Sequence, residues 1–253
     1  MLQLTNVTVS SPSKVILDDL SLTVSAGEAV GIVGESGSGK TTILKLLLGL
    51  PLNDLVFSQG SISYKDQAIS PQKKRVSYPF VGTELAWITQ QSSLGFNNNR
   101  KINHHYDDLV KSHGSQVGKM RSLEECLQMV GLDPVQISSK YPFELSGGMM
   151  QRVAIALALA THPKLLLADE PTSALDVLSK ESFIQTLIEL LRTEESSLLF
   201  VTHDMSVAKK LADRVLVMKE GKIVEEGSRE QIFQDPQDPY TQKLLRAIPK
   251  LKL

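Results

Sequence analysis

The stretch AVGIVGESGSGKTT, Ala29–Thr42, decides the fold class of this 253-residue chain. It opens with AVGIV, a run of apolar and small residues that is typical of a buried strand. The segment Gly34–Thr41 then matches the spacing G-x-x-x-x-G-K-[ST] at every fixed position. The apolar run TTILKLLLGL comes next and predicts a helix. Because a phosphate-binding loop lies between a strand and a helix, we predict one here.

The residue types of this loop suit the binding of a nucleotide's phosphates. Glycines let the backbone curl so that several N–H groups point at phosphate oxygens, and the following helix adds the positive end of its dipole. Lys40 is expected to reach the β- and γ-phosphates, and Thr41 to offer its hydroxyl to Mg²⁺. The other expected nucleotide contacts are Gly34, Glu35, Ser36, Gly37, Ser38, Gly39 and Thr42. The alternative is a flexible glycine loop that binds nothing.

Acidic residues follow a second apolar run, in the segment KLLLADE. We expect Asp169 at the end of a buried strand, where an ionised carboxylate needs a cation such as Mg²⁺. Glu170 is the candidate group that positions or deprotonates the water attacking the γ-phosphate. A surface Asp-Glu pair is the alternative. His203 follows the next apolar run, SLLFV, and is either a γ-phosphate contact or a structural histidine.

Strand and helix patterns alternate along most of the chain, which predicts an α/β fold with a mainly parallel sheet. From Ser92 to Glu144 the chain is more polar and helix-like, and this stretch is read as an insert. The segment RVLVMKEGKIVEEG, which starts at Arg214, is interpreted as a strand. The repeated βα pattern places the glycine loop in a nucleotide-binding core.

Composition limits the possible functions. Hydrophobic residues make up 42% of the chain and the formal net charge is -1, so a strongly basic face is not forced and nucleic-acid binding is disfavoured. A single cysteine, Cys126, excludes an intrachain disulfide and fits a cytosolic setting. No apolar run approaches the roughly 20 residues of a membrane-spanning helix, and no signal-peptide pattern is present. A role at a membrane would therefore require a partner.

Five motifs together give a family resemblance. Gly34–Thr41, LSGGM, LLLADE, SALD and VTHD occur in an order and spacing that resemble the nucleotide-binding subunits of ABC transporters. The resemblance covers essentially the whole chain. It implies a P-loop NTPase of the RecA-like class, with a mainly parallel core sheet, an N-terminal antiparallel β-subdomain and an inserted α-helical subdomain. It also implies a dimer that holds each ATP between the loop of one subunit and the LSGG segment of the other.

Further roles follow from the resemblance residue by residue. Gln90 matches the glutamine that contacts Mg²⁺, beside Thr41 and Asp169, and links the site to the membrane partner. His203 matches the switch histidine, and Ser173–Asp176 match a loop that crosses the dimer, with Asp176 near the nucleotide. The segment expected to contact the ATP of the partner comprises Ser146, Gly147, Gly148 and Met149.

A finer resemblance points to the importer branch for nickel, dipeptides and oligopeptides. It is carried by YPFELSGGMMQR, ADEPTSALD and DPQDPYTQKLLRAIP. The implied function is an ATP-hydrolysing subunit at the cytoplasmic face of the membrane. The implied partners are a second, different ATPase subunit, two membrane permease subunits and, indirectly, an extracytoplasmic solute-binding protein. Two departures are Ser11, where the family often has an aromatic residue that stacks on adenine, and the lack of cysteines that bind an iron–sulfur cluster in some relatives.

The resemblance also implies a division of the chain. It assigns residues 1–253 to one ABC-type ATPase domain, with 1–90 and 146–227 as the nucleotide-binding core, 91–145 as a helical subdomain and 228–253 as a C-terminal tail packing on the core. Two other functions stay open: a soluble ABC-type ATPase in assembly, such as iron–sulfur cluster assembly, and a DNA-repair or chromosome-associated ATPase. The tail disfavours the first, and the lack of heptads and paired cysteines disfavours the second.

Other residues have simpler expected roles. Cys126 is predicted to be a buried structural thiol, Trp87 and Met150 to be core residues, and Met149 to lie next to the ATP. His104, His105 and His113 are expected on a solvated helical face, with metal binding as the alternative. The cluster Lys73–Arg75 is expected in a solvated loop, with contact to membrane headgroups as the alternative.

Overall fold

The computed structural model describes residues 1–52, 54–71, 78–91, 95–114, 120–173 and 175–247. The chain forms two compact units. The first unit comprises residues 1–78 and 197–253, and the second unit comprises residues 79–196. The predicted cluster Lys73–Arg75 lies outside the described residues.

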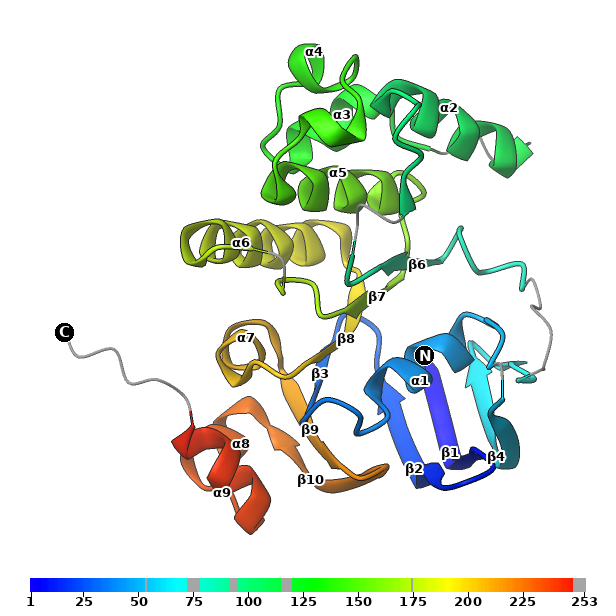
Figure 1. Ribbon diagram of the computed structural model, residues 1–253, viewed down its shortest axis with the longest axis vertical. Coiled ribbons are helices and arrows are strands. Elements are labelled where there is room, and N and C mark those ends of the chain that lie inside the picture. The colour runs from blue at the N-terminus through cyan, green and yellow to red at the C-terminus, as the bar shows by residue number, and fades with distance from the viewer. Residues whose placement is uncertain (53, 72–77, 92–94, 115–119, 174, 248–253) are drawn as a thin grey trace. The chain divides into compact units, whose positions relative to one another are not determined.

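The first unit contains an antiparallel sheet with the strand order β2-β1-β4-β5 (Figure 1). Its strands are β1 (Leu2–Ser10), β2 (Val15–Val24), β4 (Val56–Tyr64) and β5 (Gln67–Ala68). Alternate residues of β1 and β2 are buried, among them Leu2, Leu4, Leu20 and Leu22. This alternation is the pattern of a sheet that buries one face, and it confirms the predicted N-terminal strands.

The first unit also contains a mainly parallel group of strands with the order β10-β9-β3-β8. These are β3 (Ala29–Val33), β8 (Ser197–Thr202), β9 (Arg214–Lys219) and β10 (Lys222–Ser228). β3 pairs in parallel with both β8 and β9. Every residue of β3 and β8 is buried, as expected of parallel strands covered on both faces.

The segment predicted as one strand, RVLVMKEGKIVEEG, is a β-hairpin instead. β9 and β10 are antiparallel, and Lys219 pairs with Lys222 across a two-residue turn. Both turn residues have left-handed backbones, with φ of 48° at Glu220 and 85° at Gly221. Such turns match the twist of the flanking strands, but they are usually signalled by Asn-Gly or Asp-Gly. The Glu220–Gly221 pair is neither of these, so the sequence does not indicate the turn.

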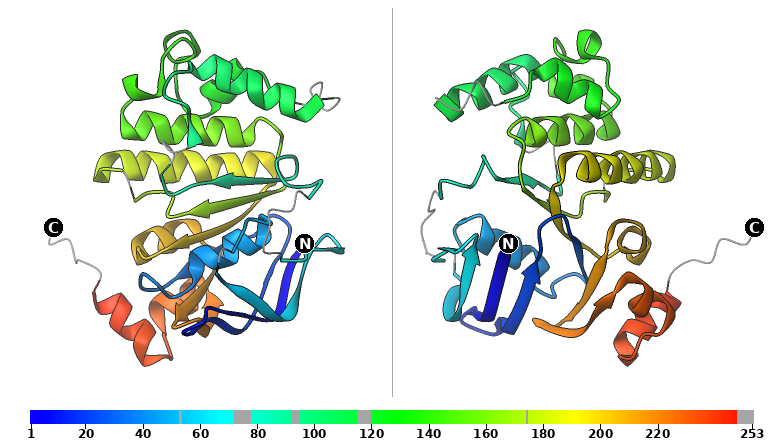
Figure 2. Two further views of the ribbon diagram at one scale, coloured as in Figure 1. Left: turned by 45° about the vertical axis from the view of Figure 1, so that its right-hand side comes forward. Right: turned by 180° about the vertical axis from the view of Figure 1, so that it is seen from behind.

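Helices complete the first unit: α1 (Lys40–Leu47), α7 (Met205–Leu211), α8 (Arg229–Gln234) and α9 (Pro239–Arg246). Ser228 begins α8 with a capping box, and Asp238 begins α9 by accepting the N–H of Tyr240. Figure 2 shows the orange and red helices α8 and α9 beside the β9–β10 hairpin. Both C-terminal helices thus pack in the same unit as the glycine loop.

The second unit consists of two parallel strands and a set of helices. The strands are β6 (Leu85–Ile88) and β7 (Leu165–Asp169). The helices are α2 (Ile102–His113), α3 (Leu123–Met129), α4 (Pro134–Ile137), the 3-10 helix η3 (Pro142–Glu144), α5 (Gly147–Leu159) and α6 (Val177–Glu194). α3 packs against α5, and Arg121 forms an ion pair with Glu194 at the end of α6. The stretch from Ser92 to Glu144 holds helices and no strand among its described residues, as predicted.

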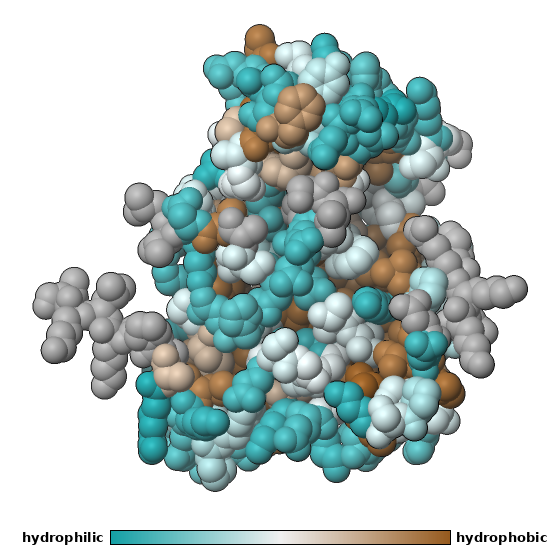
Figure 3. Space-filling model, in the orientation of Figure 1, coloured by the Kyte–Doolittle hydropathy of each residue, from teal (hydrophilic) through white to brown (hydrophobic). Residues whose placement is uncertain are grey.

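The predictions for two buried side chains are confirmed. Cys126 and Met150 both lie in the core, and burial raises the pKa of the Cys126 thiol to about 11. Trp87 is half-buried rather than fully enclosed. On the face shown in Figure 3, hydrophilic side chains predominate and hydrophobic ones occur in scattered areas. Within the described residues, no helix has the length and apolar character that crossing a membrane would require.

Candidate functional site

The glycine loop of the first unit folds around the side chain of Lys40. The Lys40 ammonium is buried and donates to the carbonyl oxygens of Gly34 and Glu35, each at 2.8 Å, and to the Ser38 hydroxyl at 3.3 Å. These oxygens come from the loop itself. They hold the positive charge of Lys40 inside the loop, where a phosphate would be bound.

Neighbouring strands hold the loop in place. Gly39 has φ of 106°, and a Cβ at this position would lie 2.7 Å from the backbone oxygen of Ile16, so only glycine fits. The N–H of Gly221 donates to the Ser38 carbonyl at 3.1 Å, and the N–H of Glu35 donates to the Tyr240 hydroxyl at 3.1 Å. α1 begins at Lys40 with no side-chain cap. The loop is therefore supported by β2, by the β9–β10 turn and by α9.

His203 lies at the same sheet edge as the loop. Val33 of β3 pairs with Thr202 of β8, so Gly34 and His203 leave adjacent parallel strands at matching positions. The side chain of His203 is exposed, while Asp204 caps α7 by accepting the N–H of Ser206 at 2.8 Å. The first unit thus brings together the predicted loop, Gly34–Thr42, and His203.

The predicted acids meet Gln90 at one edge of the second unit. Ile88 of β6 pairs with Ala168 of β7, so Gln90 and Asp169 follow from the same ends of two parallel strands. Asp169 is the last residue of β7 and is 5% exposed, whereas Gln90 is exposed. The three predicted side chains Gln90, Asp169 and Glu170 are therefore gathered at one strand edge.

Glu170 has an unusual backbone conformation for its residue type. Its φ is 47°, and its carbonyl accepts both the N–H and the hydroxyl of Ser173 at 3.1 Å. A left-handed backbone costs a residue with a Cβ of the order of 1–3 kcal/mol and is concentrated at functional positions. The short turn to Ser173 holds Glu170 in this conformation.

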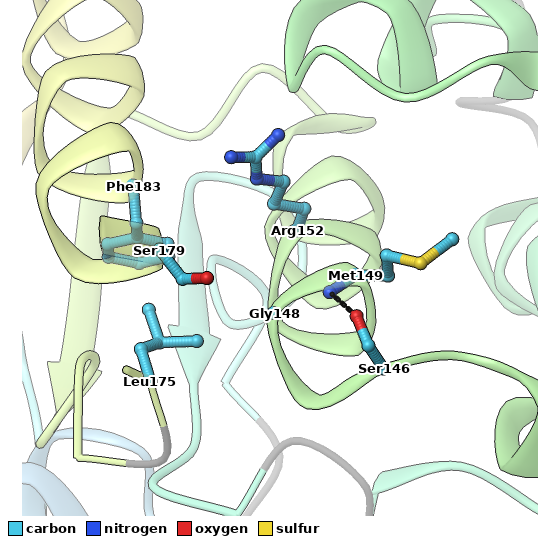
Figure 4. Close-up of a pocket in the computed structure, with 7 residues that line it drawn as sticks. All are labelled: Ser146, Gly148, Met149, Arg152, Leu175, Ser179 and Phe183. Atoms are coloured by element: carbon cyan, nitrogen blue, oxygen red, sulfur yellow. Dashed lines mark hydrogen bonds between the residues drawn. The ribbon is translucent and has the colours of Figure 1, made fainter. Parts of the chain in front are cut away.

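The predicted LSGGM segment begins α5. Ser146 is the N-cap, and its hydroxyl accepts the N–H of Met149 at 3.3 Å (Figure 4). A cavity of about 210 Å³ opens here, between the start of α5 and the start of α6. It is lined by Ser146, Gly148, Met149, Arg152, Leu175, Ser179 and Phe183.

Asp176 stabilises the start of α6. Its carboxylate accepts the N–H of Ser179 at 3.0 Å and the Ser179 hydroxyl at 2.6 Å. The N–H of Lys180 donates to the Asp176 carbonyl at 2.8 Å. Asp176 and the LSGGM segment thus belong to the two helices that border the cavity.

Sequence reasoning missed some residues of these surroundings. Arg152 and Ser179 line the cavity. The one sequence signal for this is that each lies one or two helical turns after a motif residue. The family resemblance includes Tyr240 only as part of a motif, although its hydroxyl contacts the glycine loop. A contact across 205 positions leaves no local trace in the sequence.

Two groups of residues outside these motifs have structural partners. The ring of His113 bridges the carbonyls of Leu109 and Gly82, each at 2.7 Å, and thereby ties α2 to the segment before β6. Ser11 forms a turn in which its hydroxyl accepts the N–H of Lys14 at 3.1 Å. His104 is exposed on α2 and His105 is half-buried against Phe96.

A glycine loop after a buried parallel strand, closed around a lysine at the start of a helix, defines a P-loop nucleotide-binding protein. A model of the family described as "ABC transporter" matches residues 17–173, and a model described as "Oligopeptide/dipeptide transporter, C-terminal region" matches residues 224–253. The chain therefore belongs to the ABC transporter family and is an ATPase subunit of its peptide and metal importer branch.

Relatives and solved structures agree with this assignment. The dipeptide transport ATP-binding protein DppD of Haemophilus influenzae is 38% identical over 95% of this chain and 73% of that protein. The metal-staphylopine import system ATP-binding protein CntD of Staphylococcus aureus is 35% identical over 93% of this chain and 88% of that protein. A dimeric ATP-binding cassette in a post-hydrolysis state with ADP and phosphate has a TM-score of 0.74 and 28% identity, covering 90% of this chain and 99% of that one. The predicted fold class is confirmed.

Proposed function

We propose that this chain supplies ATP hydrolysis to an importer of dipeptides, oligopeptides or a metal chelate such as that of nickel. The similarity to DppD and CntD over almost the whole chain supports these cargo classes. The match of residues 224–253 to the C-terminal region of oligopeptide and dipeptide transporters is the observation that carries the proposal. It also favours a transporter over an assembly factor or a DNA-repair ATPase.

ATP is proposed to bind with its phosphates in the loop Gly34–Thr42. The buried Lys40 ammonium supports this assignment. It can keep its bond to the Gly34 carbonyl and exchange those to the Glu35 carbonyl and the Ser38 hydroxyl for the β- and γ-phosphate oxygens. The residues that would hold Mg²⁺ are Thr41, Gln90 and Asp169, whose hydroxyl, amide and carboxylate oxygens are the donors that this hard cation prefers. A bound Mg²⁺ would neutralise charge on the phosphates.

Glu170 is proposed to orient the attacking water and accept its proton. The water oxygen bonds to the γ-phosphorus in line with the departing ADP, whose bridging oxygen takes the electron pair of the broken bond. His203 is proposed to contact the γ-phosphate. Its place at the same sheet edge as Gly34 supports that role. Lys40 stabilises the charge on the phosphates throughout.

A second chain is proposed to complete each ATP site. This chain already has its own phosphate loop, so the bare helix start at Ser146–Met149 would serve an ATP held by the partner, with Asp176 close by. Backbone N–H groups at a helix start favour a phosphate anion. The similarity to a dimeric cassette with ADP and phosphate supports the pairing. We propose that the partner is a different ATPase chain.

We also propose the remaining partners and a division of the chain, both of which rest on the family resemblance. Residues 1–90 and 146–227 would form the nucleotide-binding core, and 228–253 the C-terminal tail that packs on it. The segment 91–145 would receive short helices from two membrane permease subunits at the cytoplasmic face. A solute-binding protein outside the membrane would deliver the cargo to those subunits.

Purification of the native complex would test the proposal. The chain should copurify from detergent-solubilised membranes with two permease subunits and a second ATPase subunit. The solute-binding protein from the same system should carry a peptide or a metal chelate, identified by mass spectrometry. A chain that elutes without membrane proteins, at the same yield from the soluble fraction, would contradict the proposal.

A further inference from the structure

The Tyr240 hydroxyl contacts the phosphate-binding loop from the outside. It accepts the N–H of Glu35 at 3.1 Å. This N–H belongs to the peptide group between Gly34 and Glu35, whose carbonyl, on Gly34, accepts from the Lys40 ammonium at 2.8 Å. One peptide group is therefore held by Tyr240 at its N–H end and by Lys40 at its C=O end. Because a peptide group is planar and rigid, rotating the N–H away would also turn the carbonyl away from Lys40.

The Tyr240 ring is itself held firmly. The side chain is 9% exposed, and the Lys219 ammonium lies 5.3 Å from the ring centroid, within the range of a cation–π contact. Burial raises the pKa of the Tyr240 hydroxyl above its usual value near 10, so the group stays a neutral phenol at physiological pH. The oxygen that faces Glu35 thus has a defined position and charge state.

Hydrogen bonds connect Tyr240 to the core strands of the first unit. Asp238 caps α9 by accepting the N–H of Tyr240 at 2.7 Å. The N–H groups of Gln237 and Asp238 both donate to the Glu225 carboxylate on β10, at 2.7 and 3.1 Å. The start of α9 is therefore tied to β10, and α9 presents the phenol to the loop from a supported position.

A second contact between α9 and the loop is weaker. The Lys243 ammonium lies 4.0 Å from the Glu35 carboxylate, and both side chains are more than half exposed. An exposed pair at this separation contributes little and is screened by salt. The directional contact to the loop from α9 is thus the Tyr240 hydroxyl.

We propose that Tyr240 is a positioning residue of the nucleotide site, which fixes the Gly34–Glu35 peptide and so holds Lys40 ready for phosphate. The inference extends the role of this loop as the ATP-binding element of the proposed transporter subunit. It gives the C-terminal segment around α9 a direct part in nucleotide affinity. In this proposal Tyr240 acts through the loop backbone and not through a contact of its own with the nucleotide.

The expected effect is on binding rather than on the chemical step. Tyr240 orders the loop before the nucleotide arrives, and a loop ordered in advance binds more tightly because less order is lost on binding. Once ATP fills the loop, its phosphates hold Lys40 directly. Losing the hydroxyl should therefore raise KM for ATP and leave kcat nearly unchanged.

The test is Tyr240→Phe, which removes one oxygen and keeps the ring under Lys219. We expect Kd for both ATP and ADP, measured by titration of the full chain, to rise about 3- to 10-fold, the range expected for one hydrogen bond. In ¹H–¹⁵N spectra of the full chain without nucleotide, the Glu35 amide resonance should shift. In the assembled transporter, KM for ATP should rise by the same factor with kcat within about twofold of the parent value.

Tyr78→Phe is the matched control. The Tyr78 hydroxyl also bonds to backbone, accepting the N–H of Ser70 at 2.9 Å and donating to the Ser70 carbonyl at 2.8 Å, and Ser70 is not part of the loop. This variant should keep the parent Kd and the parent Glu35 resonance. Unfolding midpoints of both variants report any general loss of stability.

Two results would overturn the inference: an unchanged Kd for Tyr240→Phe, whether or not its kcat and unfolding midpoint fall, or an equal rise of Kd in Tyr78→Phe. Titration of the chain alone involves no membrane subunit. If the chain bound ATP but copurified with no permease, the proposed transport role would be refuted. The Kd titration of Tyr240→Phe would still test the role of Tyr240.

Discussion

At the scale of single residues, Glu170 combines a left-handed backbone conformation with the proposed role of orienting the attacking water. Its left-handed φ and the two bonds that its carbonyl accepts from Ser173 set the direction in which its side chain leaves the end of β7. Buried Asp169 comes just before it on the strand. Adjacent residues that leave a strand end in different directions can have different roles. Here the Asp169 carboxylate is proposed to bind the metal, and the Glu170 carboxylate is proposed to orient the water.

Glu170→Gln should separate binding from turnover. Glutamine keeps the size of the side chain but cannot accept a proton from water. We expect the Kd for ATP to stay within about twofold and steady-state phosphate release to fall about 10²- to 10⁴-fold, the usual contribution of a general base. Glu189→Gln, an exposed change on α6, should leave both values unchanged. Phosphate release near the parent rate in Glu170→Gln would remove Glu170 from this role.

Cys126 offers a residue-scale test of burial, since the chain has one cysteine. Its side chain is fully buried, and burial raises the pKa of its thiol to about 11. The thiolate is the reactive form, so iodoacetamide should label native protein slowly at pH 8 and label urea-unfolded protein fast. Mass spectrometry of the intact chain over time measures both rates.

The sign of the pH effect follows from the same pKa. The folded protein holds the Cys126 proton more tightly than the unfolded chain does. The contribution of the protonated Cys126 thiol to the free energy of unfolding is therefore complete below pH 9. It is lost as the pH rises from about 9 to about 11. Native labelling as fast as unfolded labelling at pH 8 would show that the thiol is accessible.

At the scale of elements, the start of α5 contains a helix cap and is also the proposed contact for a phosphate of the partner's ATP. The Ser146 hydroxyl caps the helix through the N–H of Met149, and Gly147 and Gly148 keep the same end free of side chains. A capping role and a phosphate-binding role would both explain a serine here. A substitution that keeps the helix cap but disturbs phosphate binding, or the reverse, can distinguish the two roles.

Ser146→Asp and Ser146→Ala make that separation. Aspartate caps a helix as well as serine but repels a phosphate, so we expect parent-like unfolding and a loss of ATPase activity in the assembled transporter. Alanine loses the cap, at a cost of about 1 kcal/mol in the free energy of unfolding, but adds no charge. Ser122→Ala, which removes the N-cap of α3 in the same unit, should cost a similar amount and keep the ATPase activity.

Thermal unfolding and phosphate release measure the two effects independently. If Ser146→Asp hydrolysed ATP like Ser122→Ala, the start of α5 would be a helix cap and nothing more.

The elements of this fold were largely predictable because their signals are local. Buried strands such as β3 and β7 are short apolar runs, and the glycine loop has a fixed spacing. The β9–β10 hairpin was missed because a Glu-Gly turn does not stand out from the polar residues around it. The contact of Tyr240 with Glu35 was missed because it depends on how α9 packs on the first unit, which no local pattern records.

At the scale of the whole molecule, one chain carries two features that are proposed to bind phosphate. The loop around Lys40 belongs to the first unit, and the bare start of α5 belongs to the second. If both served one ATP, changing either would empty the same site. If the start of α5 serves the ATP of a partner, the two changes would affect nucleotides on different chains.

Photolabelling of the assembled transporter with azido-ATP, after trapping with vanadate, distinguishes these arrangements. Lys40→Ala removes charge-assisted hydrogen bonds to phosphate, so label on this chain should fall at least about tenfold. Ser146→Asp should leave initial ATP binding to this chain's loop intact and instead lower the trapped label on the partner ATPase subunit, whose γ-phosphate would face the new carboxylate. Separation of the labelled subunits by gel electrophoresis shows which chain has lost the nucleotide, and Ser122→Ala should change neither. Loss of label from this chain alone in both variants would place Lys40 and Ser146 at the same ATP and contradict a site shared between two chains.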